Sequence, residues 1–165
     1  MPILQANAVE LFSNSADQSR RIGIQLGSQL QAGDVICLQG ELGAGKTTFS
    51  QGLVAGWGSS DLVTSPTFVI INVYSRADGS QINHMDAYRL EKMSEAEDLD
   101  LESYMDQGPI IIEWADRIEA LLPKERIWVN LFHVAEERRR IEIFPTGERY
   151  LEMLAKFQES VYGLT

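Results

Sequence analysis

The sequence predicts an α/β fold of three layers, with helices on both faces of a mixed sheet. Apolar runs typical of buried strands alternate with stretches in which apolar residues recur at helical spacing. A turn signal at 77–80 joins two strand-like segments, 67–74 and 81–86, which predicts an antiparallel hairpin. Residues 109–112 are wholly apolar and mostly β-branched, as expected of a strand that is covered on both faces. We therefore expect parallel strands and an antiparallel hairpin in one central sheet.

The N-terminal part of the chain is predicted to alternate strands and helices. Ser15 followed by Gln18 resembles a capping box, and apolar residues then repeat every four positions. In order, we expect an edge strand at 8–13, a helix at about 15–31 closed by Gly33, a buried strand at 35–38, and a helix that ends near Trp57 in the segment 56–60.

Acidic residues crowd the segment 91–106, where only Lys92 opposes them. Residues 94–106 are expected to be helical. The acidic side chains have two interpretations, a solvated helical face or a docking surface for a basic partner. Beyond this segment we expect a short helix at 115–122 stopped by Pro123, strands at 127–134 and 140–144, and a closing helix over about 151–161.

Residues 40–47 read GELGAGKT and match the phosphate-binding loop pattern G-x-x-x-x-G-K-[ST] at every fixed position. The loop follows a predicted buried strand and precedes a predicted helix, which is the context that gives the pattern meaning. In such loops, backbone N–H groups cradle phosphate oxygens, Lys46 would reach the β- and γ-phosphates, and the Thr47 hydroxyl would ligate Mg²⁺. The chain is therefore predicted to be a P-loop NTPase-like domain whose nucleotide contacts come from Glu41, Leu42, Gly43, Ala44, Gly45, Lys46, Thr47 and Thr48.

A phosphate loop needs an acid at the end of a neighbouring strand to hold the metal or its water. Glu113 ends the apolar run 110–112, and Asp86 ends the strand that begins at Gln81. The usual metal-binding acid at this place is Asp, so Glu113 would reach the metal directly or through a water. We expect Glu113 to coordinate the metal or activate water, and Asp86 to assist the metal or orient the attacking water.

Other residues near these acids have open interpretations. His84 would share a strand face with Asp86, and a lone His is more often a satisfied hydrogen-bonding group than a catalyst. Trp114 follows Glu113 directly and by its chemistry is a core or rim aromatic. The segment Ser65, Pro66 and Thr67 is either a proline turn or a mobile switch loop whose hydroxyl senses the γ-phosphate or metal. The basic cluster 138–140 needs no explanation beyond a solvated turn.

Composition limits the classes of function. A chain of 165 residues is expected to form a single domain, 1–165. Its net charge of −10 argues against a nucleic-acid binder that works alone. The single cysteine, Cys37, cannot form an internal disulfide and fits a reducing cytoplasm. With no signal-peptide pattern and no apolar run of about 20 residues, a soluble cytoplasmic protein is expected.

Taken together, these motifs resemble the TsaE family, bacterial ATPases involved in threonylcarbamoyladenosine modification of tRNA. The resemblance covers roughly residues 10–145 and rests on four motifs in order: GELGAGKTT at 40–48, SPTF at 65–68, HMDAYR at 84–89 and IEW at 112–114. Many families share the phosphate loop, whereas the other three motifs at this spacing are far more specific.

The resemblance implies more than the residues alone. Proteins similar to this one bind ATP or ADP with Mg²⁺, hydrolyse ATP weakly alone, and act with the partners TsaB and TsaD. TsaD transfers the threonylcarbamoyl group to the adenosine that follows the anticodon, and tRNA is held mainly by the partners. By this resemblance Lys46 and Thr47 bind phosphate and metal, Glu113 serves the metal or water, and Asp86 and Trp114 support hydrolysis, while Ser65 to Thr67 belong to the switch segment.

Two other functions stay open. A small-molecule kinase would need an acceptor pocket and usually a lid that carries arginines, and no Arg-rich insertion follows a predicted helix. The second alternative is a binding module that binds nucleotide through the same phosphate loop but does not hydrolyse it significantly. The chain contains no [NT]-K-x-D sequence for reading guanine, which favours adenine.

Overall fold

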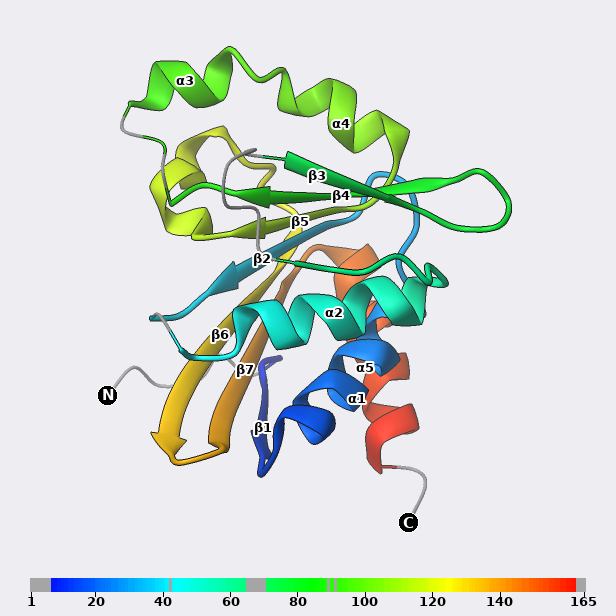
Figure 1. Cartoon of the computed structure of the whole chain (residues 1–165), viewed down its shortest axis with the longest axis vertical. Coiled ribbons are helices and arrows are strands. Elements are labelled where there is room, and N and C mark those ends of the chain that lie inside the picture. Colours follow the sequence, from blue (N-terminus) through cyan, green and yellow to red (C-terminus); the bar gives the residue numbers. More distant parts are fainter. Residues whose placement is uncertain (1–6, 42, 65–70, 89, 91, 163–165) are drawn as a thin grey trace.

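The fold was analysed in a computed structural model that describes residues 7–41, 43–64, 71–88, 90 and 92–162 (Figure 1). The described residues form one seven-stranded sheet in which the phosphate-loop strand, β2, is central. The strands follow one another across the sheet as β1 (Val9–Ser13), β7 (Arg138–Thr146), β6 (Arg126–Ala135), β2 (Val35–Gln39), β5 (Ile110–Glu113), β4 (Gln81–Asp86) and β3 (Ile71–Ser75).

The sheet is parallel in its centre and antiparallel at both margins. Strands β6, β2, β5 and β4 pair in parallel, whereas β1, β7 and β3 pair antiparallel to their neighbours. All four residues of β5 are buried, as expected for a strand covered on both faces. The β3–β4 hairpin closes where the Gly79 N–H donates to the Arg76 carbonyl at 2.9 Å. The predicted mixed sheet of a three-layer α/β fold is thus confirmed.

Helices cover both faces of the sheet (Figure 1). One layer contains α1 (Ala16–Gly27), α2 (Lys46–Trp57) and α5 (Glu148–Tyr162). The other contains α3 (Met93–Glu97), α4 (Leu101–Gln107) and the 3₁₀ helix η1 (Ala115–Leu121). Alternate residues of β2 face opposite layers: Ile36 packs in the cluster of α1, α2 and α5, whereas Cys37 packs in the cluster of α3, α4 and η1. None of the described helices is both long and apolar enough to cross a bilayer.

Helix α1 begins where the sequence predicts and ends earlier. The Ser15 hydroxyl accepts from the Gln18 N–H at 3.0 Å, and the Gln18 side chain accepts from Asn14 N–H at 2.8 Å rather than from Ser15. The helix stops at Gly27, not near residue 31. Beyond Gly27 the backbone turns, because the Asp34 carboxylate accepts from Gln31 N–H at 2.8 Å, a bond that a continuing helix would not make.

The acidic segment forms two short helices rather than one. Asp100 has a left-handed backbone (φ 52°), which interrupts the helical path between α3 and α4. Ala96 and Leu101 are buried against the sheet side, while the acidic side chains of Glu97, Asp98 and Glu102 are exposed. The segment therefore has an exposed acidic face, which both of its interpretations require.

Helices α1 and α2 pack backbone against backbone through glycines. A Cβ atom added to Gly27 would lie 2.2 Å from the Leu53 carbonyl oxygen, and one added to Gly52 would lie 2.2 Å from the Arg20 carbonyl oxygen. Gly56, expected to help end α2, lies inside the helix at a third such contact. These glycines fix α2, and with it the phosphate loop at its N-terminus, close to the rest of the helical layer.

We predict that Gly52→Ala destabilises the protein, although alanine favours helices. The added methyl group cannot fit beside the Arg20 carbonyl, and overpacking of this kind costs about 1–3 kcal/mol of unfolding free energy. Denaturant titration measures it. The matched control is Ala55→Ser at an exposed position of the same helix, which should cost only about 0.5 kcal/mol. Equal stability of Gly52→Ala and the wild type would contradict the close helix contact.

We also predict that Cys37 is unreactive in the native protein. Burial raises the pKa of its thiol from 9.0 to about 12. A pKa that is higher by three units leaves roughly a thousandfold less thiolate at pH 8, and only the thiolate reacts. A chromogenic disulfide reagent should label Cys37 at once in denaturant and only slowly in buffer. Labelling of the native protein at the rate of a small thiol would show that the strand is open to solvent.

Candidate functional site

The phosphate loop joins the end of β2 to the start of α2. Gly43 (φ 81°) and Gly45 (φ 101°) have left-handed backbones that favour glycine. A Cβ atom on Gly43 would meet no atom within 4 Å, so the loop opens onto free space at that point. Gly45 precedes the first turn of α2, whose N–H groups carry the positive end of the helix dipole. The loop backbone therefore forms an open turn at the amino end of a helix.

Lys46 is buried within this loop, with 7% of its surface exposed. Its Nζ donates hydrogen bonds to the carbonyl oxygens of Gly40 and, at 3.0 Å, of Glu41. The ammonium group also lies 4.2 Å from the centroid of the Trp114 ring, a cation–π contact. Burial lowers the pKa of Lys46, and the negative charge of Glu113 opposes part of this effect.

The two candidate acids stand side by side at the ends of neighbouring strands. Asp86 on β4 is paired with Glu113 on β5, and Leu38 on β2 is paired with the same Glu113, one residue before the end of β2. Glu113 is only 2% exposed. Asp86 is half-buried and accepts a hydrogen bond from the Tyr88 N–H at 2.8 Å. Burial raises the pKa of Asp86, and the nearby charge of Glu113 raises it further.

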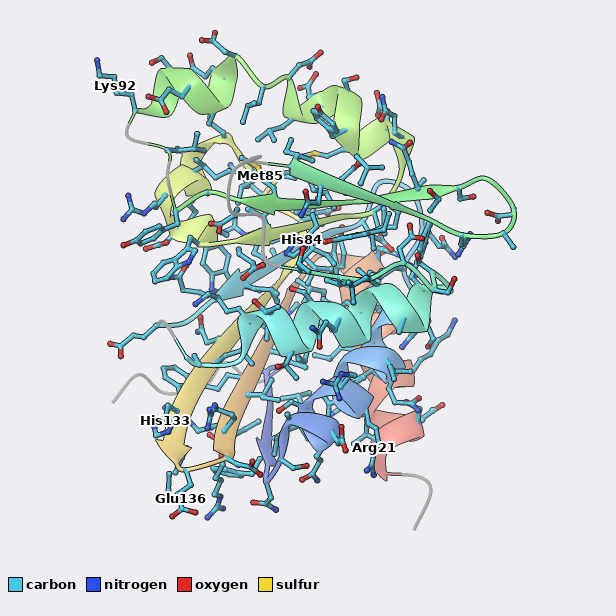
Figure 2. All side chains as sticks on the ribbon, in the orientation of Figure 1. Arg21, His84, Met85, Lys92, His133 and Glu136 are labelled. Atoms are coloured by element: carbon cyan, nitrogen blue, oxygen red, sulfur yellow. The ribbon has the colours of Figure 1, made fainter. Side chains whose placement is uncertain are left out.

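His84 lies fully buried between the sheet and α2, whereas the next residue, Met85, points to the opposite side of β4 (Figure 2). Its Nε2 atom forms a close polar contact with Oε2 of Glu113, and its Nδ1 atom lies 3.2 Å from the Tyr74 hydroxyl. His84 is thus a satisfied hydrogen-bonding residue, as its sequence context suggested. Tyr74 cannot be recognised as a neighbour of His84 from the sequence, because only the strand pairing brings it to this place.

Trp114 has an unusual backbone for a bulky residue. Its φ of 59° and ψ of 41° place it in the left-handed region, where such side chains are strained. A hydrogen bond of 3.0 Å from its N–H to the Leu38 carbonyl holds it against β2. The indole packs between Lys46 and Tyr88, whose ring centroid is 4.9 Å away. Trp114 is therefore a half-buried residue at the rim of the loop, and it also packs against the core cluster of α3, α4 and η1.

The basic cluster 138–140 does more than form a solvated turn. Arg139 donates to the Gly43 carbonyl of the phosphate loop at 3.1 Å and to the Glu136 carbonyl at 2.7 Å. Arg138 and Arg140 lie over the rings of Phe12 and Phe132 at 4.8 and 4.4 Å. The sequence analysis missed the Arg139 contact because the hairpin brings this residue to the loop from a distance of 96 positions.

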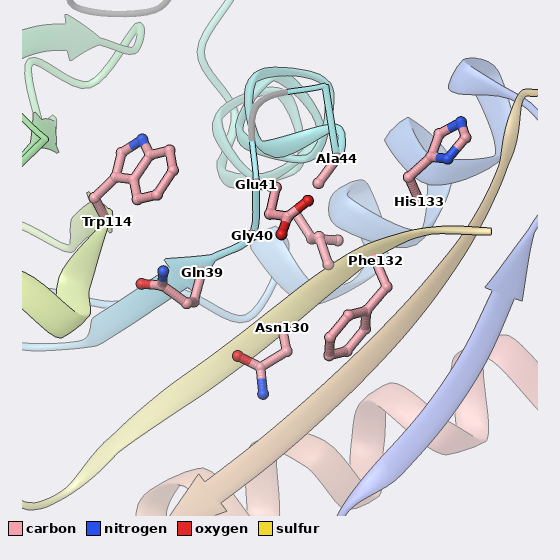
Figure 3. A pocket seen from close by; sticks show the side chains of 9 residues that line it. Gln39, Gly40, Glu41, Ala44, Trp114, Asn130, Phe132 and His133 are labelled. Carbon is pink, nitrogen blue, oxygen red and sulfur yellow. The ribbon is translucent and has the colours of Figure 1, made fainter. Parts of the chain in front are cut away.

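Two cavities border the phosphate loop. The larger, of about 440 Å³, lies beside its N-terminal half and extends along β6 (Figure 3). The smaller, of about 160 Å³, lies at its C-terminal end. The larger cavity is lined by Gln39, Gly40, Glu41, Ala44, Trp114, Asn130, Leu131, Phe132 and His133, and the smaller by Ala16, Ser19, Gly45, Thr48, Glu137 and Arg139.

The structure brings four predicted site residues into one region: Lys46, Asp86, Glu113 and Trp114. Thr47 and Thr48 occupy the first turn of α2, and both are half-buried. Within the described part of the chain, no three His, Cys, Asp or Glu side chains gather as a metal site. Leu42, the SPT segment at 65–67, and Arg89 of the HMDAYR motif lie outside the described residues.

Known proteins resemble this chain in sequence over most of its length. The model of the family described as threonylcarbamoyl adenosine biosynthesis protein TsaE matches residues 13–141. The Bacillus subtilis protein named tRNA threonylcarbamoyladenosine biosynthesis protein TsaE is 45% identical over 126 residues, which cover 75% of this chain and 77% of that protein. The protein of the same name from Streptomyces coelicolor is 41% identical over 137 residues, covering 79% of this chain and 93% of that protein.

Similarity extends to a solved structure. The crystal structure of Bacillus subtilis YdiB superposes with a TM-score of 0.78 at 31% sequence identity, and the match covers 93% of this chain and 96% of YdiB. The sequence matches and the structural match each cover most of the chain, which confirms the resemblance seen in the four motifs. This chain belongs to the TsaE family of threonylcarbamoyl adenosine biosynthesis proteins.

Proposed function

We propose that this protein is a Mg²⁺-dependent ATPase that supports the TsaB–TsaD complex in threonylcarbamoylation of the tRNA adenosine next to the anticodon. The observation that carries the proposal is the meeting of Lys46 in a phosphate loop with two strand-end carboxylates, Asp86 and Glu113. Its family membership gives the pathway, since the TsaE proteins named above belong to tRNA threonylcarbamoyladenosine biosynthesis.

The loop would hold the phosphates of ATP or ADP. Its left-handed glycines, Gly43 and Gly45, shape a concavity, and the amino end of α2 attracts anions. Lys46 would replace its hydrogen bonds to the Gly40 and Glu41 carbonyls by hydrogen bonds to phosphate oxygens. Hydrogen bonds between two charged groups are about twice as strong as those between neutral groups. The two cavities next to the loop offer room for the remaining parts of the nucleotide.

The donor set suits magnesium. Mg²⁺ prefers oxygen ligands and usually keeps several waters and substrate oxygens rather than an all-protein cage. Thr47, in the first turn of α2, and one of the two strand-end carboxylates would form such a partial set. Bound magnesium would neutralise charge on the phosphate oxygens.

Each carboxylate would then have its own task. Glu113, nearly excluded from solvent, would hold the metal or polarise a water. Asp86, half-buried on the adjacent strand, would orient the attacking water or support the metal. Trp114 would close the rim of the site over Lys46, and the segment Ser65, Pro66 and Thr67 would act as the nucleotide-sensing switch.

The charge distribution fits a subunit that works through partners. A chain of net charge −10 would repel tRNA, so TsaB and TsaD would supply most tRNA contacts in the cytoplasm. The exposed acids Glu97 and Glu102, on α3 and α4, would face a basic surface of such a partner.

The test of the proposed function is ATP turnover with and without purified TsaB, TsaD and tRNA. We expect slow turnover by the protein alone and a several-fold increase with all three present. The Glu113→Ala variant should bind ATP yet turn over at least about 100-fold more slowly in the full mixture, because it lacks the group that serves metal or water. Turnover of Glu113→Ala at the wild-type rate would make Asp86 the principal acid. Turnover that instead rises with an added small-molecule acceptor would favour a kinase.

Nucleotide binding itself is tested by Lys46→Ala. Loss of the ammonium group removes its charge-assisted hydrogen bonds to the phosphates, which are worth about 1.5–3 kcal/mol each. Titration calorimetry should show at least a tenfold weaker affinity for ADP. The exposed Lys156 of α5 is a suitable control, and Lys156→Ala should leave the affinity unchanged. Unchanged ADP affinity of Lys46→Ala would overturn the assignment of the loop.

A further inference from the structure

A row of polar side chains crosses three neighbouring strands on the face covered by α2. In the sheet register Tyr74 on β3 is paired with Ile82, two residues before His84 on β4. His84 is paired with Ile111, two residues before Glu113 on β5. Because side chains alternate along a strand, the three polar residues share one face and stand on a diagonal.

The row is hydrogen-bonded from end to end. The Tyr74 hydroxyl lies 3.2 Å from the Thr64 carbonyl oxygen and 3.2 Å from Nδ1 of His84. His84 contacts Glu113 through Nε2. His84, Glu113 and Tyr74 are 0%, 2% and 5% exposed, so these contacts are shielded from bulk solvent.

The proton count of the row gives each group a role. A tyrosine hydroxyl has one proton, and burial raises the pKa of Tyr74 and keeps that proton in place at neutral pH. That proton goes either to the Thr64 carbonyl, in which case Nδ1–H of His84 donates to the hydroxyl, or to Nδ1 of His84. In both arrangements a proton lies between Nε2 of His84 and Oε2 of Glu113, and the two groups are joined by a hydrogen bond. One carboxylate oxygen is then fixed, and within the described part of the chain the other accepts no hydrogen bond and could serve a metal ion or a water.

We propose that His84 and Tyr74 are positioning residues for Glu113: they hold its carboxylate in one orientation, and ATP hydrolysis depends on that orientation. The inference rests on the proposed function, in which Glu113 serves the metal or the attacking water. Residues that fix the tautomer and orientation of such a group commonly change activity by about 10–100-fold.

Fold stability alone does not explain the row. Its surroundings on this face are apolar, among them Ile82, Ile111 and Phe49. Burying three polar side chains there costs desolvation, and apolar residues of similar shape would be neutral or stabilising. The row therefore supports the carboxylate at its end rather than the core around it.

The experiment measures kcat and ATP affinity separately in the presence of TsaB, TsaD and tRNA. His84→Ala should lower kcat by about 10–100-fold while ATP affinity changes less than about threefold. His84→Gln keeps a side-chain N–H near the place of Nε2 and should restore most of the loss. Tyr74→Phe, which keeps the buried ring, should lower kcat in the same direction by a smaller factor.

The matched control is Asn83→Ala. Asn83 is also fully buried on β4, but on the opposite face, where it donates to the Tyr104 carbonyl at 2.9 Å. This variant should lose stability and keep kcat. When His84→Ala is added to the Glu113→Gln variant, kcat should fall no further, because His84 acts only through the Glu113 carboxylate.

The outcomes separate the inference from the proposed function. Failure of the wild type to bind or hydrolyse ATP would refute the function. If the wild type is active, the positioning role is wrong when His84→Ala keeps the wild-type kcat, or when Asn83→Ala loses as much kcat as His84→Ala. It is also wrong when the double variant His84→Ala/Glu113→Gln loses kcat by the product of the two single-variant factors. If His84→Ala does not fold, the test falls to Tyr74→Phe. An unchanged kcat of Tyr74→Phe would then refute the positioning role and leave the proposed function standing.

Discussion

Backbone pairing between β2 and β5 places Leu38 directly opposite Glu113, and the rest of the site depends on this register. The phosphate loop begins two residues beyond Leu38, so the carboxylate and the loop come together at one edge of the sheet. A slip of one residue would turn Glu113 to the face of α3 and α4 and would leave Lys46 without its acidic neighbour. The three isoleucines of β5 would fit either face, so the contact of Glu113 with His84 is what distinguishes this register from a slipped one.

The site concentrates features that are costly to fold. Lys46 and Glu113 are buried ionisable groups, and each has polar contacts there: Lys46 donates to two backbone carbonyls, and Glu113 contacts His84. Trp114 adds a left-handed backbone that costs about 1–3 kcal/mol for a bulky residue. Apolar burial on both faces of the sheet and the close packing of α1 on α2 stabilise the fold and offset these costs. A rigid frame of this kind keeps a strained site in a single arrangement.

The sequence was sufficient for the features that depend on local pattern. The strand at 110–112, the acid that ends it and the mixed sheet follow from apolar runs and a hairpin signal, and all are present in the structure. It was not sufficient where distant segments meet. Gly56 resembles a helix end until the backbone of α1 is placed against it, and Tyr74 and Arg139 approach Glu113 and the loop only through strand pairing. Such contacts depend on register and helix packing, which leave no periodic trace in one sequence.

The most direct test of the account is a crystal structure with Mg²⁺ and a non-hydrolysable ATP analogue. We expect the phosphates in the concavity of the loop at residues 43–47, with the Lys46 ammonium moved from the Gly40 and Glu41 carbonyls onto a phosphate oxygen. We also expect the metal beside Thr47, with Glu113 touching it directly or through one water. A nucleotide bound elsewhere, or an empty loop at saturating analogue, would contradict the account.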